Sequence, residues 1–254
     1  MADVTCDLTN LAETASMLRA VAPDSVINLV GATNVDECER NLHGAYLLNV
    51  RTVENLVAGL ASRKNAFLLH ISTDQVYDSP GDSDENEVRL TNTYALSKYA
   101  GESAALRMSA AVLRTNFFGP SLHPTRGSFS DWLLHKFSDG KGFTAFTDVA
   151  VTPLLMSTLS AAIKMVLNNP TVGIFNLGSH QGMTKADFAL ALAQTFDLSC
   201  AGMRRGSSND VKLAAYRPKD MCMNSSKFER TFGMKLPCLS EEIKRLRTDV
   251  NVAT

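Results

Sequence analysis

The sequence contains no glycine-rich turn, no paired cysteines and no long hydrophobic segment. No two of its fifteen glycines stand three apart, which excludes the G-x-x-G-x-x-G turn that lets a pyrophosphate approach a helix N-terminus. Its five cysteines form no C-x-x-C pair and do not cluster with the five histidines. We therefore expect reduced thiols, a cytoplasmic protein and no bound metal.

An excess of charge of one sign is also missing. The chain carries 25 Lys and Arg against 26 Asp and Glu, for a net charge of −1. The N-terminus has neither the basic nor the apolar region of a signal peptide. The most apolar long stretch, residues 152–167, is too short and too polar to cross a bilayer. We expect no nucleic-acid partner and no membrane association.

Four short apolar runs are present, and each predicts a buried strand. They are Ser25–Gly31, Ala66–Ser72, Ala111–Phe117 and Gly173–Gly178. Helical patterns lie between them, at Asn10–Val21, at Ala45–Ser62 and from Asn92 onward. Alternating strands and helices with near-continuous apolar strands predict an α/β fold with a doubly wound parallel sheet.

The pattern changes after Phe117, where turn-forming residues surround amphipathic helices. We expect residues 1–116, completed by 149–178, to form a Rossmann-like part. Residues 117–148 and 179–254 would form a smaller C-terminal substrate lobe over the carboxyl edge of the sheet.

Tyr94 and Lys98 stand four apart on a predicted helix, which places both side chains on one face. A neighbouring ammonium favours the phenolate, so the pair suits acid–base chemistry. The pair alone fits a surface tyrosine beside a surface lysine equally well. Thr73, however, follows a predicted strand at the sheet edge where ligands bind, and its hydroxyl there is suited to bonding a substrate carbonyl.

Several segments, in this order, match one known family. They are "CDLTN", "PDSVINLVGATNVDECE", "HISTDQVYD", "YALSKYAGE", "VLRTNFFGP" and "YRPKD". Together they resemble the extended short-chain dehydrogenases/reductases, and most nearly the dTDP-4-dehydrorhamnose reductases. The resemblance covers nearly the whole chain.

This resemblance implies an enzyme that reduces a nucleotide-linked 4-keto sugar with NADP or NAD. Tyr94 would donate the proton, Lys98 would lower its pKa and hold the nicotinamide ribose, and Thr73 would polarise the carbonyl. Besides Tyr94 and Lys98, the implied cofactor contacts are Asp7, Leu8, Val30, Gly31, Ala32, Thr33 and Asn49. The implied substrate contacts are Asp74, Asn116, Phe117, Trp132 and Arg217. Core packing for Trp132 and bracing of the lobe for Arg217 remain open alternatives.

Two departures from the family pattern leave alternatives open. Related dehydratases carry a glutamate where this chain has Gln75, which cannot act as a carboxylate base; reduction or epimerisation therefore remains. The absent glycine turn predicts an N-terminally incomplete sheet and impaired dinucleotide binding. A non-catalytic regulatory or nucleotide-binding subunit, resembling the regulatory subunit of methionine adenosyltransferase, is the alternative to an enzyme. A homodimer or a partner enzyme would suit either interpretation.

Overall fold

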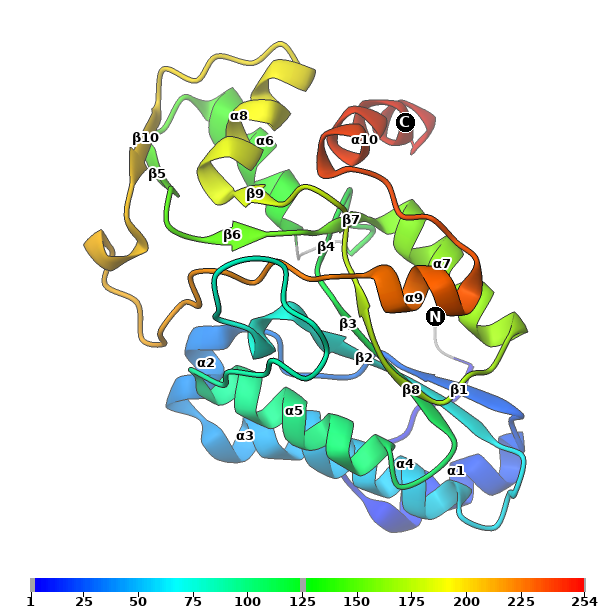
Figure 1. Ribbon diagram of the computed structural model, residues 1–254. Coiled ribbons are helices and arrows are strands. Elements are labelled where there is room, and N and C mark those ends of the chain that lie inside the picture. Colours follow the sequence, from blue (N-terminus) through cyan, green and yellow to red (C-terminus); the bar gives the residue numbers. More distant parts are fainter. Residues whose placement is uncertain (1–2, 124–126, 254) are drawn as a thin grey trace.

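A four-stranded parallel sheet forms the centre of the molecule (Figure 1). The computed structural model describes residues 3–123 and 127–253. The strands, in spatial order β1-β2-β3-β8, are β1 (Ser25–Asn28), β2 (Phe67–Thr73), β3 (Ala110–Thr115) and β8 (Gly173–Leu177). All four predicted strands are therefore present, and the predicted α/β fold with a parallel sheet is confirmed.

Helices cover both faces of the sheet, because alternate residues of each strand point to opposite sides. On one face, Leu69, Leu113 and Phe175 pack with the residues of α7 (Met156–Asn168) and α9 (Ser226–Phe232). On the other face, Leu68 and Val112 pack with other helices. The helices of this first half are α1 (Leu11–Val21), α2 (Val35–Arg40), α3 (Leu42–Tyr46), α4 (Thr52–Leu60) and α5 (Thr93–Ala105).

The expected helix over Ala45–Ser62 is interrupted. A π-helical segment, η1 (Leu47–Arg51), joins α3 to α4. Wider π turns of this kind occur frequently at functional sites. Here the segment carries the buried side chain of Asn49 toward the loop that follows β1. The periodicity correctly predicted helical structure here, but it did not indicate this local change of helix type.

The register of the sheet brings the carboxyl ends of its strands to one edge. Thr73, the last residue of β2, is level with Thr115 of β3, which is level with Leu177 of β8. Among the described residues β1 pairs only with β2, so its outer edge is open. Ile27 and Leu29, at and just beyond this edge strand, are exposed.

A smaller lobe lies over the carboxyl edge of the sheet, at the top of Figure 1. Its core joins Phe118, Leu133, Phe188 and Ile243, among others. Its helices are α6 (Phe129–Asp139), α8 (Lys185–Thr195) and α10 (Leu239–Ala253). Its strand pairs are β4 (Phe117–Phe118) with β7 (Leu154–Leu155), β5 (Phe143–Phe146) with β10 (Met203–Gly206), and β6 (Ala150–Val151) with β9 (Met183–Thr184). Two short 3-10 turns complete the described elements, η2 (Asp74–Val76) and η3 (Ser208–Asp210).

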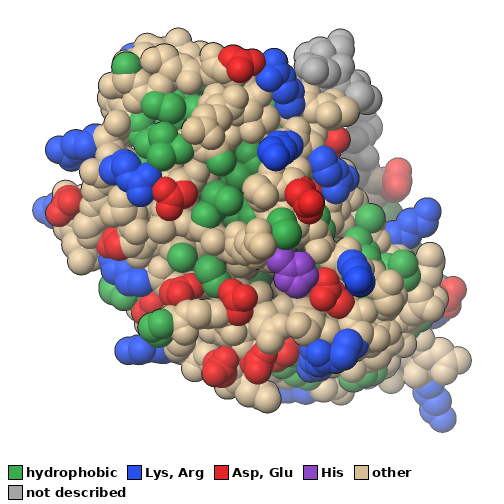
Figure 2. All heavy atoms as spheres, turned by 45° about the horizontal axis from the view of Figure 1, so that its top comes forward, with side chains coloured by type: hydrophobic (Ala, Val, Ile, Leu, Met, Phe, Trp, Pro, Cys, Tyr) green, Lys and Arg blue, Asp and Glu red, His purple; other side chains and the backbone are tan. Residues whose placement is uncertain are grey.

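The surface carries charge of both signs. On the face shown in Figure 2, acidic and basic side chains are interspersed around hydrophobic ones, without a large patch of one sign. Within the described residues, no helix is both long and apolar enough to cross a membrane. All five cysteines are free.

Candidate active site

A cavity of about 490 Å³ opens at the carboxyl ends of β1, β2 and β3. Parallel α/β sheets bind their ligands at this edge. Three residues singled out from the sequence, Thr73, Tyr94 and Lys98, all line it. The remaining lining residues are Leu29, Gly31, Thr33, Ile71, Ser72, Asp74, Gln75, Thr115, Asn116, Phe117, Met156, Leu159, Ser160 and Ile163.

Helix α5 presents Tyr94 and Lys98 to this cavity. The side chain of Asn92 caps the helix by accepting a hydrogen bond from the backbone N–H of Ala95 at 2.8 Å. The cap fixes where the helix begins and therefore which face carries Tyr94 and, one turn later, Lys98. Both side chains are buried, with 8% and 6% of their surface exposed.

The pKa of Tyr94 differs from the sequence-based expectation. Burial raises it to about 12, a hydrogen bond with Thr73 opposes this rise, and the charge of Asp74 adds to it. The ammonium of Lys98 instead donates to the backbone carbonyl of Ile71 at 2.6 Å. In this arrangement Tyr94 holds its proton firmly at neutral pH.

Lys98 is itself perturbed by its surroundings. Burial lowers its pKa to about 8, while the nearby carboxylate of Glu102 raises it. Its charge is therefore sensitive to pH in the neutral to weakly alkaline range.

Asp74 begins η2 directly after Thr73, and it is buried. Burial raises its pKa to about 6, although hydrogen bonds from Asn116 and Thr73 and the charge of Lys185 lower it. The Asn116 Nδ2 group donates to Asp74 Oδ2 at 2.7 Å. Asn116 therefore braces Asp74 at the cavity wall, and Phe117 lies beside it with 45% of its surface exposed.

The loop after β1 is held from behind by Asn49. Its side-chain oxygen accepts from the backbone N–H of Ala32 at 2.8 Å, and its Nδ2 donates to the Ala32 carbonyl at 3.2 Å and to Ser97 Oγ at 2.8 Å. A Cβ on Gly31 would lie 2.9 Å from Asn49 Oδ1, so a glycine is needed there. Gly31 and Thr33 line the cavity, whereas Asn49 and Ala32 support the loop.

Two of the predicted cofactor contacts lie away from the triad. The Asp7 carboxylate is exposed and accepts from the backbone and hydroxyl of Thr9. The Leu8 carbonyl accepts from Asn55 Nδ2 at 2.9 Å. Neither residue lines the cavity, and Val30, with 38% of its surface exposed, is also not among its lining residues.

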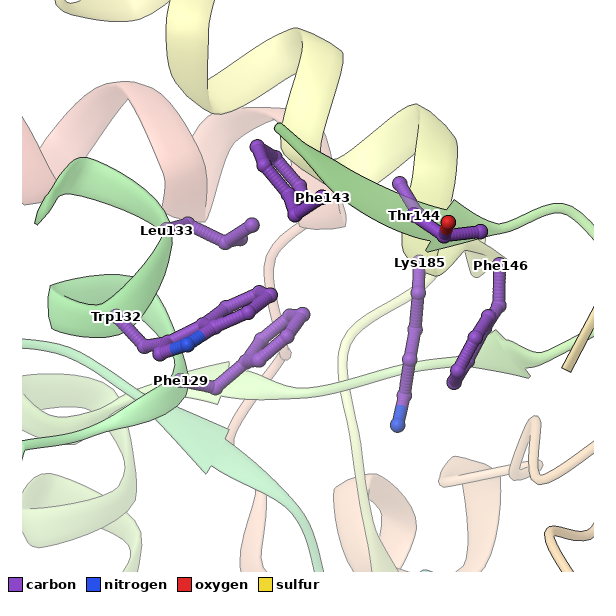
Figure 3. Close-up of a pocket in the computed structure, with 8 residues that line it drawn as sticks. Phe129, Trp132, Leu133, Phe143, Thr144, Phe146 and Lys185 are labelled. Carbon is purple, nitrogen blue, oxygen red and sulfur yellow. The ribbon is translucent and has the colours of Figure 1, made fainter. Parts of the chain in front are cut away.

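Trp132 and Arg217 lie outside this cavity as well. Trp132 stacks on Phe129, with ring centroids 6.1 Å apart, in a separate aromatic pocket of the lobe (Figure 3). Arg217 forms an ion pair with Asp36 at 2.8 Å and donates to the Ala215 carbonyl. Its contacts within the chain are those of a bracing residue, and they join the lobe to α2.

The sequence reading missed a buried ionic network behind the triad. The Arg114 guanidinium donates to both oxygens of Glu102, and Ser72 Oγ donates to Glu102 Oε1 at 2.5 Å. Glu102 stands one turn beyond Lys98 on α5, so the spacing Tyr94–Lys98–Glu102 was a usable signal. Lys185 was also missed, because nothing in its local sequence indicates that it approaches Asp74.

The fold and this cavity define a class: α/β proteins that place a Thr–Tyr–Lys set at the carboxyl edge of a parallel sheet. Residues 2–252 match the family model described as the RmlD substrate binding domain. The chain therefore belongs to that family.

Individual proteins agree with this assignment. The chain is 27% identical over 264 residues to a dTDP-4-dehydrorhamnose reductase of Escherichia coli, covering 98% of this chain and 87% of that protein. It is 26% identical over 242 residues to the methionine adenosyltransferase 2 subunit beta of Xenopus tropicalis, covering 91% and 72%. The fold matches a dTDP-4-dehydrorhamnose reductase of Bacillus anthracis solved with NADP, with a TM-score of 0.88, 20% identity and coverage of 96% and 87%.

Proposed function

We propose that this protein is an NADP- or NAD-dependent reductase of a nucleotide-linked 4-keto sugar. The observation that carries the proposal is that Thr73, Tyr94 and Lys98 line one cavity at the carboxyl edge of the sheet. The names of the related reductases support the same activity. We also propose that residues 1–116 with 149–178 form the Rossmann-like part, and that residues 117–148 and 179–254 form the substrate lobe.

The residues present fit the nicotinamide end of a dinucleotide. Gly31 and Thr33 leave backbone open to the cavity, and Lys98 offers an ammonium that can bind ribose hydroxyls. The described residues hold no glycine-rich turn for the pyrophosphate. A reduced nicotinamide, when bound, supplies the hydride.

The protein's own groups would supply the proton and the orientation. Tyr94, protonated at neutral pH, donates its proton to the carbonyl oxygen of the substrate, and Thr73 hydrogen-bonds the same oxygen. Asp74, held by Asn116, contacts a sugar hydroxyl from the cavity wall. Gln75 in place of a carboxylate disfavours dehydration, and epimerisation remains the alternative chemistry.

The test is oxidation of NADPH, followed by its absorbance, in the presence of dTDP- and UDP-linked 4-keto sugars. Tyr94→Phe should lower turnover at least about 100-fold. Tyr99→Phe is the matched control, because Tyr99 lies on the same helix but does not line the cavity; it should keep wild-type turnover. Equal rates for wild type and Tyr94→Phe would refute the assigned role.

A second candidate is a non-catalytic regulatory subunit. The similarity to methionine adenosyltransferase 2 subunit beta, over 91% of this chain, favours it. Calorimetric titration of the folded protein with NADPH and NADH separates the candidates. Binding that weakens in Tyr94→Phe and Lys98→Ala supports the enzyme, whereas absence of binding and of turnover supports the subunit. The subunit would function in a complex with a partner enzyme, whereas a homodimer is compatible with both.

A further inference from the structure

Helix α5 holds the end of β2 by hydrogen bonds to three successive residues of that strand. The pairs are Ile71 with Lys98, Ser72 with Glu102, and Thr73 with Tyr94. The three helix residues stand four apart in the sequence, so they follow one another along one face of α5. Two of them belong to the Thr–Tyr–Lys set, and the third, Glu102, shares their position against the strand.

The carboxylate of Glu102 is buried and fixed in place. Its side chain is 1% exposed. The Arg114 guanidinium on β3 donates three hydrogen bonds to its two oxygens at 2.7 to 3.1 Å, and Ser72 Oγ donates a fourth at 2.5 Å. Because this carboxylate is held rigidly and out of water, its field reaches neighbouring groups with little screening.

The functional group exposed to that field is Lys98. It stands one turn before Glu102 on α5 and is also buried. Burial lowers the pKa of Lys98 to about 8, and the charge of Glu102 opposes this. Among residues 3–123 and 127–253, the ion pair that Glu102 forms within 4.0 Å is with Arg114 and not with Lys98. Glu102 therefore acts on Lys98 through space and not by contact.

Other groups around the lysine do not supply a competing negative charge. The charged or titratable groups on the elements packed here are Tyr94 on α5, His70 on β2, Arg114 on β3, Asp74 on η2 and Cys38 on α2. Burial and the lysine's own charge hold the pKa of His70 well below its usual range, so its ring is neutral. Burial raises the pKa values of Tyr94 and Cys38, which leaves both protonated at neutral pH. The charge of Asp74 acts on Tyr94 and on the lobe. The buried residues of α3, η1 and α4, elements that the structure describes in full, are uncharged.

We propose that Glu102 is a positioning residue of the active site, whose fixed carboxylate keeps the ammonium of Lys98 charged in the cavity. This inference rests on the proposed function, in which a charged Lys98 binds the nicotinamide ribose. Without Glu102, no neighbouring negative charge opposes the effect of burial, and Lys98 loses its proton closer to neutral pH. Arg114 and Ser72 then serve the site by holding Glu102 in place.

The test is a heteronuclear NMR pH titration, without dinucleotide, of protein labelled with a stable carbon isotope at the lysine ε-carbon. The Lys98 signal is the one missing from Lys98→Arg. We expect Glu102→Gln, which retains an acceptor for Ser72 Oγ, to lower the pKa of Lys98 by at least about one unit. Glu54→Gln is the control, because Glu54 lies on α4 and pairs with Arg51 at 3.3 Å. The pKa of Lys98 should be the same in this control as in wild type.

A second variant guards against loss of the fold. Glu102→Gln leaves the buried charge of Arg114 without its partner and should be less stable than wild type. The double variant Glu102→Leu, Arg114→Met removes both charges. The pKa of Lys98 is perturbed by burial and by Glu102, so the double variant should shift it in the same direction. Far-UV circular dichroism establishes that each variant is folded before its titration.

Dinucleotide binding gives a second measurement that a merely structural role would not move. Calorimetric titration with NADPH from neutral to alkaline pH should show that affinity falls at a lower pH in Glu102→Gln than in wild type. Adding Lys98→Arg to that variant should remove this pH dependence, because arginine stays charged. Weaker binding with an unmoved midpoint would overturn the inference, as would a Lys98 pKa that is equal in wild type and in both Glu102 variants.

These outcomes separate the inference from the proposed activity, because the NMR titration needs no dinucleotide. A Lys98 pKa that depends on Glu102, in a protein that neither binds nor oxidises NADPH, would support the electrostatic role of Glu102 and contradict the proposed reductase. NADPH-dependent turnover with a Lys98 pKa that is insensitive to Glu102 would do the reverse.

Discussion

Replacing Arg114 by methionine should destabilise the protein more than any exposed charge substitution. Arg114 and Glu102 are each 1% exposed, and their closest ion-pair contact is 2.7 Å. The guanidinium also donates to Tyr77 Oη and to the Glu85 carbonyl, both at 2.7 Å. Burial works against the charge, but the hydrogen bonds and charge of Glu102 outweigh it and raise the pKa of Arg114. Methionine fills similar space but leaves Glu102 charged without its partner.

The expected loss follows from the cost of that orphaned carboxylate. Removing one member of a buried ion pair costs about 3–5 kcal/mol, because the remaining charge is neither solvated nor paired. Ser72 Oγ still donates to Glu102 in the variant, so a value near the middle, about 4 kcal/mol, is expected. With a urea m-value of about 3 kcal/mol/M, this lowers the unfolding midpoint by about 1.3 M.

The measurement is urea unfolding followed by far-UV circular dichroism. Arg247→Met is the matched control, because the Arg247–Asp197 pair is 3.0 Å long but 53% and 75% exposed; its loss should be below about 1 kcal/mol. The double variant Glu102→Leu, Arg114→Met removes both charges and should recover part of the loss. If Arg114→Met is too unstable to purify, Glu102→Leu takes its place: it leaves the Arg114 charge unpaired, so the double variant should be more stable than Glu102→Leu.

A midpoint for Arg114→Met that lies as close to wild type as that of Arg247→Met would refute this reasoning. So would additive losses for the two halves of the pair, because additivity means that neither residue depends on the other.

Three further predictions concern the cavity and its support. Burial raises the pKa of Asp74 to about 6, against 3.8 ordinarily, so ionisation of Asp74 destabilises the folded protein as the pH rises through this interval. The free energy of unfolding of Asp74→Asn should therefore exceed that of wild type by up to about 3 kcal/mol at pH 7.5 and by little at pH 4. A pH-independent difference in urea unfolding would contradict this. Because the pKa of Lys98 is about 8, NADPH affinity measured by calorimetry should fall above that pH in wild type but not in Lys98→Arg, which stays charged; parallel pH profiles would exclude Lys98 as the titrating group. A Cβ at Gly101 would lie 2.3 Å from the Asn49 carbonyl oxygen, whereas one at Gly142 meets its nearest atom at 3.6 Å; Gly101→Ala should therefore lose about 1–3 kcal/mol of stability and Gly142→Ala much less, and similar melting curves for the two would show that α5 can shift.

The parts of the fold set by local pattern could be predicted from the sequence. Buried parallel strands are continuous apolar runs, so β2 and β3 were located to within one or two residues. The helix predicted from Asn92 onward is α5, and Asn92 is its N-cap, a position that asparagine favours. The predicted continuous helix between Ala45 and Ser62 is interrupted by a π-helical segment, which the hydrophobic spacing in the sequence did not indicate.

The site was predictable only in part for a related reason. Thr73, Tyr94 and Lys98 lie at a strand end and on one helix face, so their convergence follows from local geometry. Lys185 is 112 residues beyond Thr73 in the chain, and Asp36 is 181 residues before Arg217. Contacts across such separations depend on how the lobe packs on the sheet, which no local pattern records.

Asp74 connects the two halves of this arrangement physically. Asn116, just after β3, donates a hydrogen bond to its carboxyl. The charge of Asp74 adds to the effect of burial in raising the pKa of Tyr94, and the charge of Lys185 lowers the pKa of Asp74. With a pKa of about 6, Asp74 is ionised at neutral pH. Burial raises the pKa of Tyr94 to about 12 and the charge of Asp74 adds to this rise, so the phenol is protonated at neutral pH. A protonated phenol can donate to a carbonyl but cannot accept a proton from an alcohol. The charges around the cavity therefore agree with the proposed role of Tyr94 as the proton donor.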